Sequence, residues 1–124
     1  MDYKSRFNSI FVDFVSDLIK IFPNDSDLHM CLTAINTLLL LDDSMLNNMF
    51  HKHVSTMREF ILKKDEQFFL NKDYKELYTQ DEEYYSSMIN KLKNYWTKLE
   101  DYNKDSVWKY FSVLIMLDDK IHHM

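Results

Sequence analysis

The stretch "VWKYFSVLIML", Val107 to Leu117, decides the fold because it is apolar around most of one helix. Lys109 and Ser112 are its plainly polar residues. At 100° per residue, the apolar side chains of the helix that contains it cover roughly 220°, whereas a surface helix needs an apolar face of only about 100°. The run is far shorter than the ~18 apolar residues of a membrane-spanning helix. We therefore expect a central helix of a folded domain, or a helix whose apolar face a partner completes.

Helical spacing of apolar residues extends over most of the chain, and no segment has the sustained alternation of a half-buried strand. A first helix carries apolar residues from Phe7 to Phe22 and is ended by Pro23. A second helix is predicted over 28–39, with a cap at Asn24, Asp25 or Ser26, and a third runs from a cap in 42–44 to about Leu62. A short helix is predicted near 65–70, and a longer one runs from a capping box at Thr79 to Leu99. The last helix begins at Asp105 or Ser106, after Asn103 as a left-handed residue. The sequence predicts an all-α fold, a compact bundle of five or six helices, in a single helical domain over residues 1–124.

The second predicted helix is almost as apolar as the last. Its polar strip is little more than His29, Thr33, Asn36 and Thr37. A helix with so little polar surface has to cover its apolar sides somewhere. We expect the second and last helices to be central in the bundle, flanked by the others, or to be completed by a partner.

Composition excludes several classes of function. The chain has no glycine, so it cannot build a glycine-rich phosphate loop, a nucleophile elbow or a dinucleotide fingerprint. The scarcity of Gly, Pro, Ala and Arg beside abundant Lys indicates an AT-rich genome. A single cysteine, and an N-terminal stretch without the apolar run of a secretory signal, predict a soluble, intracellular protein that is not secreted and has no membrane partner.

Histidines are the first candidates for a metal site, but their spacing argues against one. His51 and His53 are two positions apart, so on a helix they point in different directions. We expect His51 to face solvent and His53 to lie on the apolar side as a hydrogen-bonded core residue. Asp118 and His122 have the spacing that ligands on one helix need, but they stand near the last residue, where a helix frays. The sequence predicts no metal ligands and no cofactor.

Residues for covalent or acid–base catalysis are also missing from the pattern. Cys31 lies between Leu28 and Leu32 on an apolar face, where a thiol behaves as a small hydrophobic group. The acidic runs stand at expected helix ends, where capping and solubility explain them. We therefore expect no catalytic residue, no small-molecule substrate and no enzyme activity.

Protein interaction has positive support. Eight Met and nineteen aromatic residues (Phe 9, Tyr 8, Trp 2) are more than a core of this size readily hides, and Tyr, Trp and Met are enriched at interface centres. An AT-rich coding sequence that uses Tyr in place of Leu explains the same composition. The leading interpretation is a non-enzymatic protein that binds another protein or assembles with itself through the apolar face of 107–121. The candidate partner-binding residues are Trp96, Trp108, Phe111, Ile115 and Ile121.

A nucleic-acid-associated accessory factor is the alternative. "KLKNYWTKLEDYNKDSVWKYF", Lys91 to Phe111, interleaves lysines with aromatic residues, a combination that binds phosphates and stacks bases. Tyr95 and Trp96 share the apolar side of their helix, however, and the net charge of −5 opposes attraction to phosphates. The lysines of this alternative are Lys91, Lys93, Lys98, Lys104 and Lys109.

Three stretches together resemble a known group of proteins. They are "FVSDLIKIFPND" (14–25), "KKDEQFF" (63–69) and "LKNYWTKLEDYNKDSVWKYFSVLIML" (92–117), with "VWKYF" the most specific part. The pattern looks like that of uncharacterised short helical proteins from nucleocytoplasmic large DNA viruses (giant viruses). The resemblance implies a viral protein that acts in the host cytoplasm, in a viral factory, or in the virion. The group has no known activity, so no catalytic residue is carried over.

Overall fold

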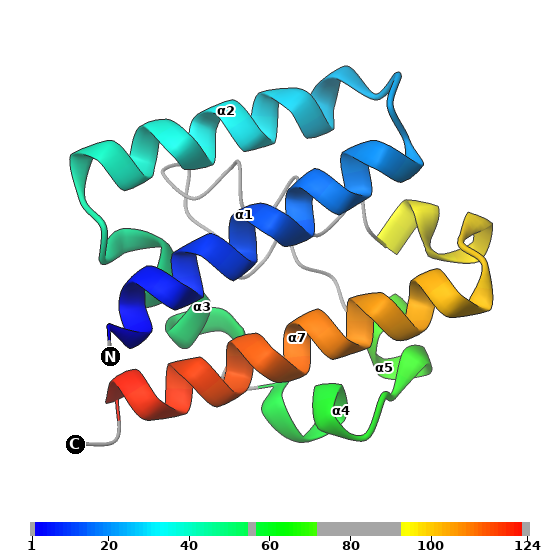
Figure 1. Ribbon diagram of the computed structural model, residues 1–124. Helices are drawn as coiled ribbons and strands as arrows, with labels where there is room; N and C mark the ends of the chain where they lie inside the picture. The colour runs from blue at the N-terminus through cyan, green and yellow to red at the C-terminus, as the bar shows by residue number, and fades with distance from the viewer. Residues whose placement is uncertain (1, 55–56, 72–92, 123–124) are drawn as a thin grey trace.

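A computed structural model describes residues 2–54, 57–71 and 93–122 (Figure 1). In these ranges the helices are α1 (Tyr3–Ile21), α2 (Ser26–Leu41), α3 (Met45–Val54), α4 (Arg58–Leu62), α5 (Glu66–Asn71), a 3-10 helix (Trp96–Lys98) and α7 (Asp101–His122). No strand occurs in the described part, and the all-α class is confirmed. Four of these helices, α1, α2, α3 and α7, are seven residues or longer. The count of five or six helices in one bundle therefore stays a prediction.

Helix α1 lies between α2 and α7 and packs against both (Figure 1). Its side chains Phe7, Phe11, Phe14 and Leu18 are buried, and their spacing of three and four residues places them on one side of the helix. Asp2 caps the start by accepting a hydrogen bond from the Ser5 amide at 3.1 Å. Hydrogen bonds from the Ser5 hydroxyl and amide hold the pKa of Asp2 below its ordinary value. As predicted, the helix ends just before Pro23.

Aromatic rings join the helices of the core. Phe7 of α1 meets Phe50 of α3 edge to face, with ring centroids 5.0 Å apart. Phe14 of α1 contacts Phe111 of α7 in the same way at 5.4 Å. Such edge-to-face pairs add about 0.5–1.5 kcal/mol to the free energy gained from burial alone. The core is therefore held along the length of α1 by contacts to two different helices.

Helix α7 buries most of its apolar side within the chain. It packs against α1 and α4, and it buries Val107, Trp108, Phe111, Leu114, Ile115 and Leu117. Its predicted start was wrong, because the helix begins at Asp101 and Asn103 lies inside it. The break comes earlier, at Leu99, whose backbone is extended with ψ 141° after the short 3-10 helix. No helix in the described part of the chain is long and apolar enough to cross a membrane.

The third predicted helix is divided into α3 and α4, although the sequence favoured one helix to about Leu62. Helix α4 ends with Lys64 in the left-handed region at φ 57°. The Asp65 amide donates to the Phe60 carbonyl and the Lys64 amide to that of Ile61, which together form a Schellman motif. A chain without glycine uses lysine here, at the position where glycine is the usual residue. The helix that the sequence opens at Thr79 falls mostly on residues 72–92, outside the described ranges.

Candidate functional site

Most of α2 lacks charged residues, which is unusual for a helix at the surface of a protein. Over residues 28–41 the helix carries no Asp, Glu, Lys or Arg. Ordinary surface helices place charged residues on the side that faces water. This helix instead has a composition typical of a buried one, so where it lies in the fold decides what its surface does.

Helix α2 is oriented by its cap and by its contact with α1. The Asp25 carboxylate accepts from the amides of Asp27 at 2.9 Å and Leu28 at 3.2 Å, which fixes the first turn. From there Leu28, Cys31 and Ile35 are buried. These three share one side of the helix, so the opposite side has to face outward.

The large apolar residues on the outward side are Met30, Leu40 and Leu41, with exposed fractions of 60%, 89% and 80%, and the polar residues His29 and Asn36 are exposed as well. Thr33 and Thr37 lie between them and are also exposed. The expectation that α2 is central in the bundle was therefore wrong. Helix α1 lies along one side of α2 (Figure 1). The apolar residues Met30, Leu40 and Leu41 on the other side are exposed to solvent.

An open hollow of about 350 Å³ lies on this same side of α2. Its lining is His29, Met30, Thr33 and Ala34, in the first half of the helix. Ala34 is the single alanine of the chain, and the small side chains of Thr33 and Ala34 leave a depression between the larger residues. The protruding residues Leu40 and Leu41 stand on the same side, in the last turn. We call residues 30, 33, 34, 37, 40 and 41 the outer α2 face.

The partner-binding residues predicted from the sequence lie in a different place. Trp96, Trp108, Phe111 and Ile115 are all buried in the core, and Ile121 is half-buried against it. Their apolar surface is already covered by α1 and by neighbouring turns. The apolar face of 107–121 was therefore the wrong location for a contact surface, because packing inside the chain uses most of it.

The lysines of the nucleic-acid alternative do not act as one set. Lys104 forms an ion pair with Glu66 at 3.5 Å and lies over the Trp96 ring. Lys98 lies over the Tyr95 ring, 5.4 Å from its centroid. Lys109 is exposed, Lys93 is half-buried, and Lys91 lies outside the described residues.

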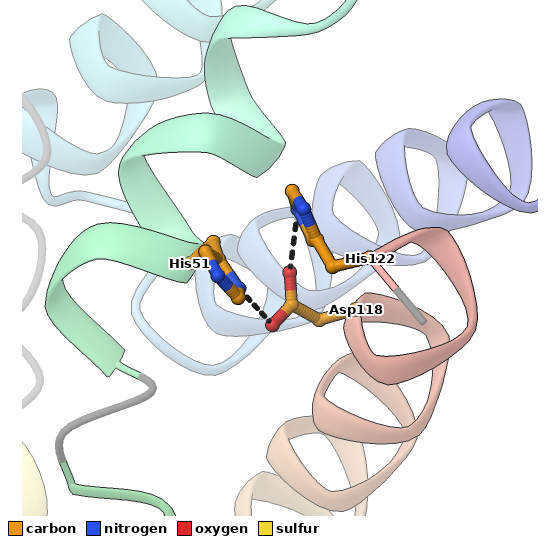
Figure 2. A group of neighbouring side chains, drawn as sticks. All are labelled: His51, Asp118 and His122. Atoms are coloured by element: carbon orange, nitrogen blue, oxygen red, sulfur yellow. Dashed lines mark hydrogen bonds and ion pairs between the residues drawn. The ribbon is translucent and has the colours of Figure 1, made fainter. Parts of the chain in front are cut away.

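A second cluster joins α3 to the last turn of α7 (Figure 2). His51 of α3 bonds through Nδ1 to Oδ2 of Asp118 at 2.8 Å. His122, one turn beyond Asp118 on α7, places its Nε2 at 3.4 Å from Oδ1 of the same carboxylate. The two imidazole rings are stacked, with centroids 3.8 Å apart.

Asn47 also belongs to this cluster and lies on α3, one turn before His51. Its side-chain amide donates to Oδ1 of Asp118 at 2.9 Å, and its Oδ1 lies 2.9 Å from Nε2 of His122. Asn47 and Asp118 are both buried, with exposed fractions of 2% and 4%. The neighbouring Asp119 pairs instead with Arg58, and this hydrogen bond raises the pKa of the guanidinium.

The sequence alone did not bring His51 together with Asp118 and His122. His51 was expected to face solvent, but it is half-buried against Asp118. The four-residue spacing of Asp118 and His122 was the available signal, and only the tertiary contact between α3 and α7 adds His51 to it. The side chain of His53 lies outside the described residues.

Comparison of the chain with protein-family models, with curated proteins and with solved structures finds no match in any of the three.

Proposed function

We propose that this protein is a non-enzymatic self-assembly and interaction module, and that it pairs with a second copy of itself through the outer α2 face. One observation carries the proposal: Leu40 and Leu41 are 89% and 80% exposed on a helix that lacks charge over 28–41. A patch of this kind on a small domain usually marks an interface. The outer α2 face therefore replaces the apolar face of 107–121 as the proposed contact surface.

The layout of the outer α2 face supports an antiparallel pair. Large residues stand at its two ends, Met30 in the first half and Leu41 in the last turn, with Ala34 and Thr37 between them. A two-fold axis near the middle places the last turn of one copy on the first half of the other. Leu40 and Leu41 then enter the hollow beside Met30 and Ala34, and the same contact occurs twice.

The expected affinity follows from the size of this surface. A helix of sixteen residues is about 24 Å long, and one pair of such helices buries less than a standard interface of roughly 1,600 Å². We expect dimers that form in the micromolar range and dissociate on dilution. Small residues at the crossing point allow the helix backbones to approach closely.

The first test is the solution mass, measured by light scattering across a wide range of concentration. We expect the mass to rise from the 15.1 kDa of one chain toward twice that value. Leu41→Lys places a charge in the contact and should keep the protein monomeric. Met116→Lys is the matched control, because Met116 is 51% exposed on α7 and lies off the proposed surface.

A complementation experiment distinguishes the antiparallel pair from a parallel one. Met30→Glu and Leu41→Lys should each weaken self-association. Mixed together, they should form a heterodimer, because Glu at 30 of one copy faces Lys at 41 of the other in the antiparallel arrangement only. Failure to recover association in the mixture contradicts this arrangement. A mass of one chain at every concentration contradicts self-association itself and leaves a different protein as the partner.

Nucleic-acid association remains the alternative prediction, and salt-sensitive retention on DNA or RNA tests it. Replacing Lys93 and Lys109 should abolish such retention and leave the solution mass unchanged. Self-assembly through α2 predicts the opposite pattern for Leu41→Lys. The two proposals therefore make different predictions for the same two measurements.

The proposed setting follows from the resemblance to giant-virus proteins. We propose that assembly takes place in the host cytoplasm, in a viral factory, or in the virion. There a micromolar affinity is sufficient, since assembly sites concentrate their components. Immunolabelling of infected cells would test this location.

A further inference from the structure

We propose that His51, Asp118 and His122 bind a divalent transition-metal ion of the zinc type. Together they offer two imidazole nitrogens and one carboxylate oxygen, the donor types that zinc prefers in proteins. The proposal does not depend on self-association, because all three residues belong to one chain.

Distances between the donor atoms fit a shared ion. The ligand atoms of the three residues all lie within 4.8 Å of one another. Donors at ~2.0–2.1 Å from a tetrahedral zinc ion lie about 3.3 Å apart. His51 Nδ1 lies 2.8 Å from Oδ2 of Asp118, and His122 Nε2 lies 3.4 Å from Oδ1 of the same carboxylate. The two rings are stacked with centroids 3.8 Å apart, so they have to turn about their side-chain torsions before both nitrogens point at one ion.

The surroundings of Asp118 favour a cation beside its carboxylate. A carboxylate this deeply buried is costly unless a positive charge or several hydrogen bonds compensate it. Within the described residues its contacts are the Asn47 amide and the two imidazoles. Arg58 also acts on Asp118 electrostatically, and a metal ion would place a positive charge in direct contact with the carboxylate.

Asn47 acts as the outer partner of the site. Metal ligands are usually oriented by a second hydrogen bond, and here the Asn47 amide holds Oδ1 of Asp118. In the cluster as described, the proton on His122 Nε2 points to Oδ1 of Asn47, as assigned from the network. Metal binding through Nε2 requires the His122 proton to be on Nδ1 of the same ring. The hydrogen bond from the Asn47 side-chain amide to Asp118 is kept.

Three protein ligands leave one position of a tetrahedral ion for water or a small ligand. The ion would also link α3 to the last turn of α7, two segments 67 positions apart in the chain. Binding should therefore raise the melting temperature as well as occupy the site.

Calorimetric titration of the chelator-treated full chain with Zn²⁺ tests the proposal. We expect one ion per chain, and a 10- to 100-fold or greater loss of affinity in His51→Gln and in His122→Gln. His29→Gln is the matched control, because it removes a histidine from α2, away from the cluster. Affinity should remain unchanged in this control.

A third variant, Asp118→Asn, keeps the size of the side chain and removes its charge. Circular dichroism establishes whether each variant remains folded. Titration with Co²⁺ adds a second readout, because its visible absorption reports the coordination geometry of the bound ion. Absence of binding at millimolar Zn²⁺ in the unaltered protein overturns the proposal. Equal affinities in the unaltered chain, His51→Gln and His122→Gln would do the same, and the cluster would then be a hydrogen-bonded clamp.

Discussion

Helices α2 and α7 have the same kind of sequence but lie in different environments. Both have narrow polar strips and long apolar sides. Helix α7 buries its apolar side against α1 and α4, whereas α2 buries Leu28, Cys31 and Ile35 and exposes Leu40 and Leu41. The comparison teaches that apolar content fixes how much surface must be covered, while the order of helices around α1 decides which part is covered within the chain.

The size of the effect is considerable. Complete burial of one leucine side chain contributes about 1.5–3 kcal/mol. For α7 this free energy stabilises the fold, whereas for the last turn of α2 it becomes available only when a second surface covers it. Substitution of the same residue type should therefore cost much more stability on α7 than in the last turn of α2.

The largest effect is expected from shortening a leucine on α7. Leu114 is fully buried, and Leu114→Ala should lower the free energy of unfolding by about 2–5 kcal/mol, through lost burial and the cavity left behind. Leu40→Ala, the matched change on α2, should alter the stability of the dilute monomer by less than about 0.5 kcal/mol. Denaturant titration at low protein concentration measures both. Equal losses would remove the distinction between the two helices.

A second effect is confined to the contact between α1 and α7. Burial, aided by a hydrogen bond from its hydroxyl to Asp17, raises the pKa of Tyr110 to about 12. Because this value is above the ordinary 10.0, the stabilisation is complete below pH 10 and is lost as the pH rises toward 12. Tyr110→Phe should cost about 1 kcal/mol at neutral pH and flatten that decline.

Ultraviolet titration of the tyrosinate band and unfolding at several alkaline pH values would check this prediction. A decline of equal steepness in Tyr110→Phe would assign the alkaline loss to other groups.

A smaller gain is expected where α4 ends beside α7. Lys64 holds a left-handed backbone at φ 57°, which costs a residue with a Cβ atom about 1 kcal/mol relative to glycine. Lys64→Gly should therefore raise the free energy of unfolding by up to that amount. Lys63→Gly is the control, since Lys63 has a right-handed backbone and the change should destabilise. A loss of stability in both variants would contradict this account.

The smallest effect should be the same on both helices. Thr37 on α2 and Ser106 on α7 each bond through the hydroxyl to the carbonyl four residues earlier, at 3.0 Å. Both are exposed, and alanine is the better helix former, so Thr37→Ala and Ser106→Ala should each stabilise by about 0.5 kcal/mol or less. Thermal melts of the two variants would reveal whether exposed positions on α2 and α7 are equivalent.

Local signals predicted the parts of the fold that depend on neighbours in sequence. Pro23 and Asp25 mark the junction between α1 and α2, and the short helix near 65–70 is present as α5. The division between α3 and α4 was missed because the helical spacing of apolar residues continues across it. The start of α7 at Asp101 was missed because the polar residues that suggested a break are tolerated inside its first turns.

The sites were less predictable because they depend on tertiary contacts. Apolar spacing identified α2 as a helix in need of cover, but it could not say that α1 would cover only one side. Asp118 and His122 were visible as a pair, while His51 joins them across 67 positions of chain. No local pattern encodes such a meeting.

Both tryptophans of the chain, Trp96 and Trp108, meet edge to face with ring centroids 5.2 Å apart. Trp96 is 1% exposed and donates its indole N–H to Glu66 at 2.6 Å. The tryptophan fluorescence of the protein therefore originates from one buried pair of rings beside α7. Emission should report the melting of the core while remaining blind to events on α2, so the protein carries its own dye for separating unfolding from assembly.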